Sequence, residues 1–89
     1  MLLENRVAVI SGSANGMGKA MAFKFAGEGC KIVVADLKID QAQQVAEDIK
    51  AGGGEAIAVK ADISVSKEIK ALITESVDRF GKIDILVNN

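Results

Sequence analysis

The sequence predicts an α/β protein in which a parallel sheet lies between layers of helices. Four short apolar, β-branched segments alternate with three segments in which apolar residues recur every three or four positions. The connections between them are short, and the 89 residues contain no proline. This β-α-β-α-β-α-β order favours parallel strands joined by right-handed crossovers. We therefore expect a Rossmann-like, three-layer α/β/α fold with strand order 3-2-1-4.

The first half of the sequence contains two strands and the helix between them. Residues 6–11 are a short β-branched run, and residues 31–36 are a second one that is apolar almost throughout. Residues 16–28 have helical periodicity, and Gly29 follows as a stop. The expected apolar face of this helix consists of Met17, Ala20, Met21 and Phe25.

The second helix and third strand follow the same alternation. The helix is expected to begin near Asp40, a plausible N-cap, and to end at the three glycines 52–54. Its apolar stripe consists of Ala42, Val45, Ala46 and Ile49. Residues 55–60 then form the third strand.

The last part of the chain predicts a third helix and a fourth strand. Ser64 is the expected N-cap of the helix, and Gly81 is its stop. The apolar stripe of this helix consists of Ile69, Leu72, Ile73, Val77 and Phe80. Residues 83–87 are apolar enough to be covered on both faces, as in other parallel sheets. In the order 3-2-1-4 this strand is an edge and a template for pairing with another chain.

Composition indicates one small domain over residues 1–89 and excludes several function classes. The net charge of −1 argues against a nucleic-acid surface. No apolar run approaches the ~18 residues of a membrane span. The single Cys30 cannot form an internal disulfide, which fits a reducing, cytoplasmic setting, and its place before an apolar strand predicts a buried structural thiol.

Three glycines between the first strand and the first helix predict a phosphate-binding turn. Gly12, Gly16 and Gly18 have the spacing G-x-x-x-G-x-G. Such glycines permit a sharp turn, close approach of a pyrophosphate to the backbone, and close packing of helix on strand. The pyrophosphate would meet free N–H groups at the helix N-terminus. Side chains of Ser11, Ser13 and Asn15 could bond to it or hold the shape of the loop. The alternative is a tight turn without a ligand.

An acidic residue at the end of the second strand favours a dinucleotide. Asp36 follows Gly12 by 24 positions, where a carboxylate can accept both hydroxyls of an adenosine ribose. The same charge would repel a 2′-phosphate, so NAD is favoured over NADP. Leu37 supplies no guanidinium to reverse this preference, although Lys19 and Lys38 could weaken it. Alternatively, Asp36 only closes a turn.

Polar residues also follow the third and fourth strands. Asp62 could bind the adenine amino group while Ile63 packs against the ring, although an Asp followed by a Ser also indicates helix capping. Asn88 and Asn89 end the fourth strand at the carboxyl edge, where α/β sheets bind ligands. Polar residues are common at strand ends, so these two asparagines could either bind a ligand or simply end the strand.

These motifs resemble the classical short-chain dehydrogenase/reductase family. Residues 11–18, Ser-Gly-Ser-Ala-Asn-Gly-Met-Gly, match its TGxxxGxG signature with Ser for Thr, and residues 80–89 resemble the strand leading into NNAG. The resemblance implies an NAD-selecting role for Asp36, an adenine contact for Asp62, and a sheet-stabilising, adenosine-side role for Asn88 and Asn89. The expected cofactor-binding residues are Gly12, Ser13, Asn15, Gly16, Met17, Gly18, Asp36, Leu37, Asp62, Ile63, Asn88 and Asn89.

The resemblance also implies a catalytic half that these residues do not contain. Family members carry a Ser, a Tyr-x-x-x-Lys pair and a helical Asn further along the chain, and this sequence has neither Tyr nor His. We expect no catalytic residue, no metal site and no turnover from the chain alone. It would be the adenosine-binding part of an NAD(P)-dependent oxidoreductase acting on an alcohol or carbonyl. The alternatives are a dinucleotide-binding module without catalysis and a fragment that self-associates through strand four.

Overall fold

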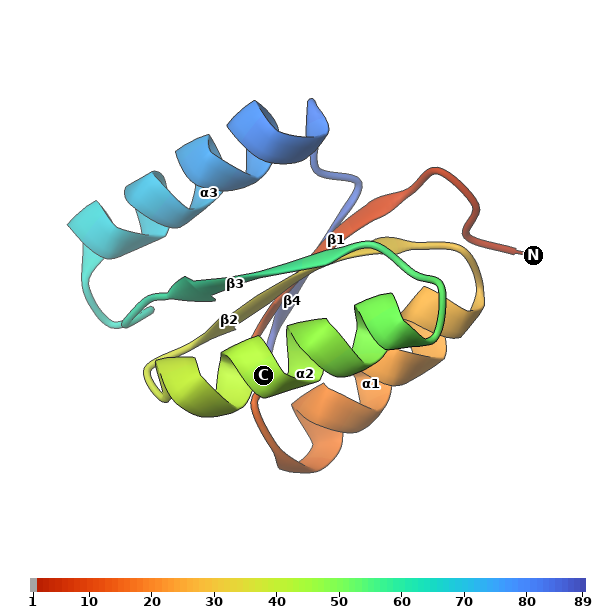
Figure 1. Cartoon of the computed structure of the whole chain (residues 1–89). Coiled ribbons are helices and arrows are strands. Elements are labelled where there is room, and N and C mark those ends of the chain that lie inside the picture. The colour runs from red at the N-terminus through yellow and green to blue at the C-terminus, as the bar shows by residue number, and fades with distance from the viewer. Residues whose placement is uncertain (1) are drawn as a thin grey trace.

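The computed structural model describes residues 2–89 and contains a four-stranded parallel sheet of order β3-β2-β1-β4. Helices α1 and α2 cover one face and α3 covers the other (Figure 1). The predicted architecture and strand order are confirmed. The strands are β1 (Val7–Ser11), β2 (Lys31–Asp36), β3 (Ala56–Lys60) and β4 (Ile85–Asn88). The helices are α1 (Gly16–Gly27), α2 (Ile39–Ala51) and α3 (Ser66–Phe80).

The register of the sheet gathers the expected site residues at one edge. Ser11, the last residue of β1, lies opposite Ala35 of β2 and Asn88 of β4. On the far side of β2, Asp36 lies opposite Lys60 at the end of β3. Because all four strands are parallel, their carboxyl ends meet at this edge, next to the loop that leads into α1.

The face covered by α1 and α2 contains the larger hydrophobic cluster. The predicted stripe of α2 is confirmed, because Ala42, Val45, Ala46 and Ile49 are all buried. The predicted face of α1 is partly wrong. Its buried residues are Gly18 and Ala22, and Met17 is 73% exposed. Small residues let α1 approach the sheet closely. With Gly18 and Ala22 facing the sheet, the side chain of Met17 points toward solvent beside the loop.

Helix α3 covers its face of the sheet less completely than predicted. Of the expected stripe, Leu72 is buried, whereas Ile73 and Val77 are exposed. The second buried residue of α3 is Ser76, whose hydroxyl donates to the Leu72 carbonyl oxygen at 2.7 Å. Leu86 of β4 is 60% exposed, so the expectation that β4 is covered on both faces is also wrong. A single helix is too narrow to cover this face of the sheet.

The two predicted N-caps are displaced by neighbouring carboxylates. Helix α2 begins at Ile39 with Lys38 at the N-cap, and helix α3 begins at Ser66 with Val65 there. Asp40 lies instead inside the first turn of α2. In front of α3, Ser64 belongs to a turn in which its backbone N–H donates to an Asp62 carboxylate oxygen at 2.9 Å. In front of α3, the predicted capping residue therefore bonds within the preceding turn instead of capping the helix.

Asp84 fastens the start of β4 to the start of β1. Its carboxylate accepts a hydrogen bond from the Val7 N–H at 2.9 Å, and its own N–H donates to the Val7 carbonyl oxygen at 2.9 Å. Arg6 and Lys82 form ion pairs with the same carboxylate, at 3.5 and 3.1 Å. The hydrogen bond from Val7, followed by these cations, lowers the pKa of Asp84. This arrangement occupies residues 83 and 84, and β4 begins at Ile85 instead of the predicted residue 83.

We expect the fold to lose stability when Asp84 is replaced, and more with Ala than with Asn. Asp84→Ala leaves the buried Val7 N–H without its acceptor, whereas Asp84→Asn keeps an amide oxygen there. Because the folded-state pKa of Asp84 is lowered, its contribution is present above the unfolded carboxyl pKa of about 3.9 and is lost as pH falls through the folded pKa. Urea denaturation between pH 7 and pH 2.5 measures this. A wild type and Asp84→Ala that lose stability equally on acidification would contradict the assignment.

Candidate nucleotide-binding site

The loop between β1 and α1 turns at two glycines with positive φ. Gly12 has φ +65° and Gly16 has φ +59°, a region that other residues adopt at a cost. A Cβ on Gly12 would lie 3.1 Å from the Asn89 carbonyl oxygen, whereas a Cβ on Gly16 would meet no atom within 4 Å. Packing therefore requires a small residue at position 12, and at position 16 the backbone faces open space that a ligand can approach.

Gly18 brings the first turn of α1 against the end of β1. A Cβ at this position would collide with the Gly12 carbonyl group and would lie 2.8 Å from the Asn89 side-chain nitrogen. No side chain fits there without moving the backbone. The third glycine thus has the packing role that its spacing predicts.

The N-terminus of α1 is left without a side-chain cap. Asn15 is the N-cap residue, but its side chain makes no capping hydrogen bond. Its amide donates instead to the Gln41 side chain of α2 at 3.4 Å. The first N–H groups of a helix have no partner within the helix, and the helix dipole makes this end positive. An anion in front of Gly16 would therefore meet free donors.

Ser11 at the end of β1 and Ser13 in the loop hold the shape of the loop. Ser13 is completely buried, and its hydroxyl donates to the Ile10 carbonyl oxygen at 2.7 Å. The Ser11 hydroxyl lies 3.2 Å from the Val87 carbonyl oxygen and accepts a hydrogen bond from the Asn89 N–H at 3.1 Å. Of the two roles expected for these hydroxyls, the structure shows the one that maintains the loop.

Asp36 lies directly beside the loop. One carboxylate oxygen accepts a hydrogen bond from the Ala14 N–H at 3.1 Å, and the other accepts one from the Lys38 N–H at 3.0 Å. The carboxylate thus connects the end of β2 with both the glycine loop and the entrance to α2. Each oxygen retains lone-pair capacity for a further donor.

A hollow of about 150 Å³ opens at this edge of the sheet. It brings together six of the twelve residues expected to bind the cofactor. Its lining residues are Ser11, Gly12, Asp36, Leu37, Ala61, Asp62, Ile63 and Asn89. The exposed side chains of Leu37 and Ile63 provide apolar surface beside the two carboxylates. The combination suits a flat, partly apolar ring attached to a polyol.

Asp62 has a structural role whether or not it binds a ligand. One carboxylate oxygen accepts both the hydroxyl and the N–H of Ser64, at 2.6 and 2.9 Å, and these bonds lower the pKa of Asp62. Its backbone N–H donates to the Glu68 carboxylate at 2.9 Å. The turn with Ser64 therefore occupies one oxygen of the carboxylate, but Asp62 does not cap α3, whose N-cap residue is Val65 and has no side-chain capping bond.

The two asparagines at the end of β4 hold the sheet and the loop together. The Asn88 side-chain oxygen lies 3.3 Å from the Ser11 hydroxyl, and the Asn89 side-chain nitrogen donates to the Gly12 carbonyl oxygen at 3.4 Å. Asn89 lines the hollow described above, whereas Asn88 lines a separate apolar groove between β4 and α3. Asn89 is thus the closer of the two to the candidate site.

The sequence did not indicate two residues that shape the site. Gln41 positions the Asn15 side chain from the first turn of α2, and Ala61 continues β3 with its N–H bonded to the Asp36 carbonyl oxygen at 3.2 Å. Neither position has a local signal, because each contact joins segments that are far apart in the sequence.

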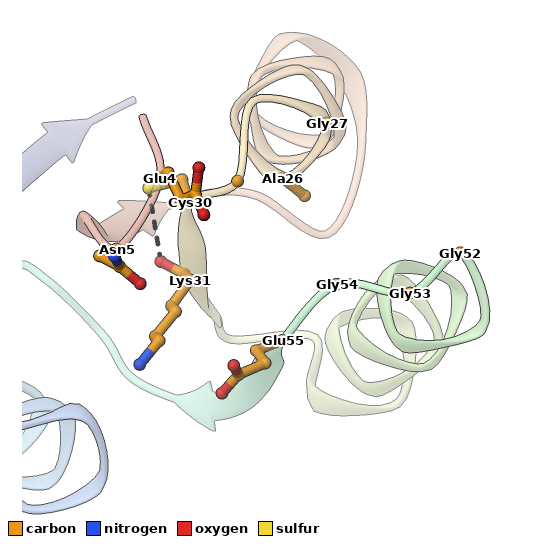
Figure 2. A pocket seen from close by; sticks show the side chains of 11 residues that line it. Glu4, Asn5, Ala26, Gly27, Cys30, Lys31, Gly52, Gly53, Gly54 and Glu55 are labelled. Carbon is orange, nitrogen blue, oxygen red and sulfur yellow. Dashed lines mark hydrogen bonds between the residues drawn. The ribbon is translucent and has the colours of Figure 1, made fainter. Parts of the chain in front are cut away.

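A larger hollow at the opposite end of the sheet has the wrong polarity for phosphate. It measures about 300 Å³ and lies between the ends of α1 and α2 (Figure 2). Helix C-termini are the negative ends of their dipoles, and Glu4 and Glu55 add two carboxylates against the single cation of Lys31. Cys30 lies at its base, 2% exposed, and burial raises the pKa of its thiol. This thiol is buried, as predicted from the sequence.

Residues 2–89 contain neither a cluster of metal-binding side chains nor a membrane-spanning helix. No three side chains of His, Cys, Asp or Glu gather there closely enough to hold a metal ion. None of the helices in this part of the chain has both the length and the apolar character of a membrane span.

Comparisons with known proteins identify the family of the chain. The model of the short chain dehydrogenase family matches residues 6–89. The subunit BbsD of (2S)-[(R)-hydroxy(phenyl)methyl]succinyl-CoA dehydrogenase from Thauera aromatica is 38% identical over the whole chain, which spans 36% of that protein. The 7alpha-hydroxysteroid dehydrogenase of Escherichia coli K12 is 40% identical over 98% of the chain, which spans 34% of it.

A solved structure extends the similarity to three dimensions. A hydroxysteroid dehydrogenase from Escherichia coli superposes with a TM-score of 0.95 and 40% identity, over 98% of this chain and 37% of the other. The chain thus spans little more than a third of the relatives it matches. With the fold, the glycine loop and the family match in agreement, the chain belongs to the short-chain dehydrogenase family.

Proposed function

We propose that this chain binds the ADP part of NAD at the carboxyl edge of its sheet. The observation that carries the proposal is the uncapped N-terminus of α1 behind Gly16, whose missing Cβ faces open space. A diphosphate there would accept hydrogen bonds from backbone N–H groups at the positive end of the helix. Family membership implies a nicotinamide dinucleotide, and the loop, the carboxylate and the hollow fit its adenosine diphosphate half.

The remaining expected residues have complementary roles in this proposal. Asp36 accepts the ribose hydroxyls, and Leu37 and Ile63 contact the adenine ring from the two sides of the hollow. Asp62 has a second carboxylate oxygen with which to accept the adenine amino group. Met17 lies exposed at the mouth of the loop, where it can contact the remainder of the dinucleotide.

For a whole protein that includes this chain, we propose hydride transfer between the nicotinamide and an alcohol or carbonyl substrate. The matched relatives are named as dehydrogenases of hydroxylated compounds, which supports this class. In this proposal the two carboxylates of the candidate site, Asp36 and Asp62, bind the adenosine part of the cofactor. Without Tyr or His in the 89 residues, the chain alone has no evident group to exchange a proton with the substrate oxygen. We therefore propose that these residues bind the dinucleotide without catalysing its turnover. We also propose a cytoplasmic location.

Substitution of Gly16 tests the phosphate site. Gly16→Ala and Gly81→Ala are matched, because both glycines have positive φ and open space at the Cβ position, and Gly81 follows α3 at the far end of the sheet. Each variant should lose about 1–2 kcal/mol of stability. A Cβ at position 16 would fill the space that the diphosphate approaches, so calorimetric titration with ADP should show a loss of affinity of about tenfold or more for Gly16→Ala alone, as for one lost hydrogen bond to a charged group. Equal ADP affinity in the two variants would contradict the proposed site.

The preference for NAD is tested with ADP and its 2′-phosphorylated form. Repulsion between the Asp36 carboxylate and the added phosphate should weaken binding of the latter by about tenfold or more at low salt. In Asp36→Ala the ratio of the two affinities should approach one, because any general effect on binding cancels in the ratio. Equal affinity of the wild type for both ligands would contradict the preference.

We also propose that the chain self-associates through β4. In the order β3-β2-β1-β4 this strand pairs on one side with β1 and is otherwise an edge, and its Leu86 is exposed beside the apolar groove under α3. Exposed apolar edge strands pair readily with other chains. A second copy of β4 would extend the sheet and cover Leu86.

Sedimentation of the 89-residue chain tests this proposal. A concentration-dependent dimer is expected, and Leu86→Lys should shift it toward monomer because an edge lysine disfavours strand pairing. Phe23→Lys is the control, since Phe23 is an exposed apolar residue on α1, across the sheet from Leu86 and α3. A strictly monomeric wild type, with freely exchanging β4 amides, would refute self-association.

A further inference from the structure

Asp36 makes a hydrogen bond that a ribose-binding role does not require. Its carboxylate accepts the N–H of Ala14, a residue in the middle of the glycine loop, at 3.1 Å. Ala14 lies between Gly12 and Gly16, the two positions at which the backbone turns with positive φ. The carboxylate therefore holds the loop at a point between its two flexible corners.

The other hydrogen bonds that join this part of the loop to β2 and α2 are longer. The Ser13 N–H is 3.4 Å from the Ala35 carbonyl oxygen, and the Asn15 side chain is 3.4 Å from that of Gln41. Hydrogen bonds to an ionised carboxylate are about twice as strong as neutral ones. The bond from Ala14 to Asp36 is thus the strongest of the three that fix residues 13–15 against β2 and α2.

We propose that Asp36 is a positioning residue for the phosphate-binding loop, in addition to its contact with the ribose. By holding Ala14, it aligns the backbone N–H groups at the start of α1 before the ligand arrives. Affinity for the diphosphate then depends on Asp36 even when the ligand has no ribose hydroxyls. The inference rests on the proposed nucleotide binding and adds to it a second route by which one carboxylate acts.

Electrostatics and positioning predict opposite results for the loss of this carboxylate. A carboxylate close to a diphosphate repels it, so removing the charge alone should strengthen binding. Removing the support of the loop should weaken binding, because the loop must then be ordered at the expense of binding free energy. A ligand that cannot hydrogen-bond to Asp36 through its ribose separates the two effects.

The experiment compares ADP with 2′,3′-dideoxy-ADP in calorimetric titrations of the 89-residue chain. In Asp36→Ala the affinity for dideoxy-ADP should fall about threefold to tenfold, the range expected for one lost hydrogen bond. Asp40→Ala is the control, because Asp40 is an exposed carboxylate in the first turn of α2. Its removal deletes the same charge near the site and should leave dideoxy-ADP binding unchanged or slightly stronger.

The possible results distinguish a failure of the positioning role of Asp36 from a failure of nucleotide binding itself. If Asp36→Ala weakens ADP but leaves dideoxy-ADP unchanged or tighter, the carboxylate acts through the ribose alone and the inference is wrong, while nucleotide binding stands. If the wild type binds neither ligand, the proposed function fails and the inference fails with it. Equal losses of dideoxy-ADP affinity in Asp36→Ala and Asp40→Ala would also overturn it.

A measurement on the wild type keeps the inference testable if Asp36→Ala fails to fold. Scalar coupling across a hydrogen bond, between the Ala14 amide nitrogen and the Asp36 carboxylate carbon, reports the bond directly by NMR. We expect this coupling in the unliganded chain. Its absence from spectra that resolve the corresponding backbone couplings between β1 and β2 would overturn the inference.

Discussion

The close approach of α1 to the end of β1 is the constraint on which the rest of the site depends. At Gly18 the helix backbone lies against the Gly12 carbonyl group, in a space that admits no Cβ. This contact fixes the direction in which the first turn of α1 points. It also determines which face of α1 is buried, since Ala22, the other buried residue of the helix, lies one turn after Gly18 on that face. The exposure of Met17 and the open space in front of Gly16 are consequences of the same contact.

The parallel sheet places every other component around that contact. In parallel strands the carboxyl ends lie together, so the residues that follow β1, β2, β3 and β4 converge without any contact between them in the sequence. Asp36 is the center of this arrangement, because it accepts hydrogen bonds from the glycine loop and from the start of α2. The opposite edge has the negative ends of α1 and α2, whereas the candidate site has the positive end of α1, so the helix dipoles make the two ends of the molecule electrostatically different.

Much of the fold could be predicted from the sequence because its signals are local. Apolar periodicity defined all seven elements, and the glycine spacing identified the loop. Errors of two kinds occurred. The N-caps were misplaced for a local reason, because the carboxylates of Asp36 and Asp62 each accept the N–H group two residues further along the chain, just before the helix begins. The other errors occurred where distant segments decide the outcome. The apolar stripe of α3 has regular spacing, but spacing cannot say how much of a sheet one helix covers. Gln41 and Asp84 carry no local motif and act only through partners on other elements.

The position of Ser11 has a consequence for the order in which the chain can fold. The Ser11 hydroxyl bonds to the Asn89 N–H, which lies 78 positions away, and β1 occupies the middle of the sheet although it comes first in the sequence. As the chain is synthesised, β1 can pair with β2 early, but its other side stays unpaired until β4 has been made. Such long-range closure is slow compared with the formation of helices. The support of Gly12 by Asn89 therefore forms only after β4 has docked, and a fully shaped nucleotide site requires all four strands of this sheet to be in place.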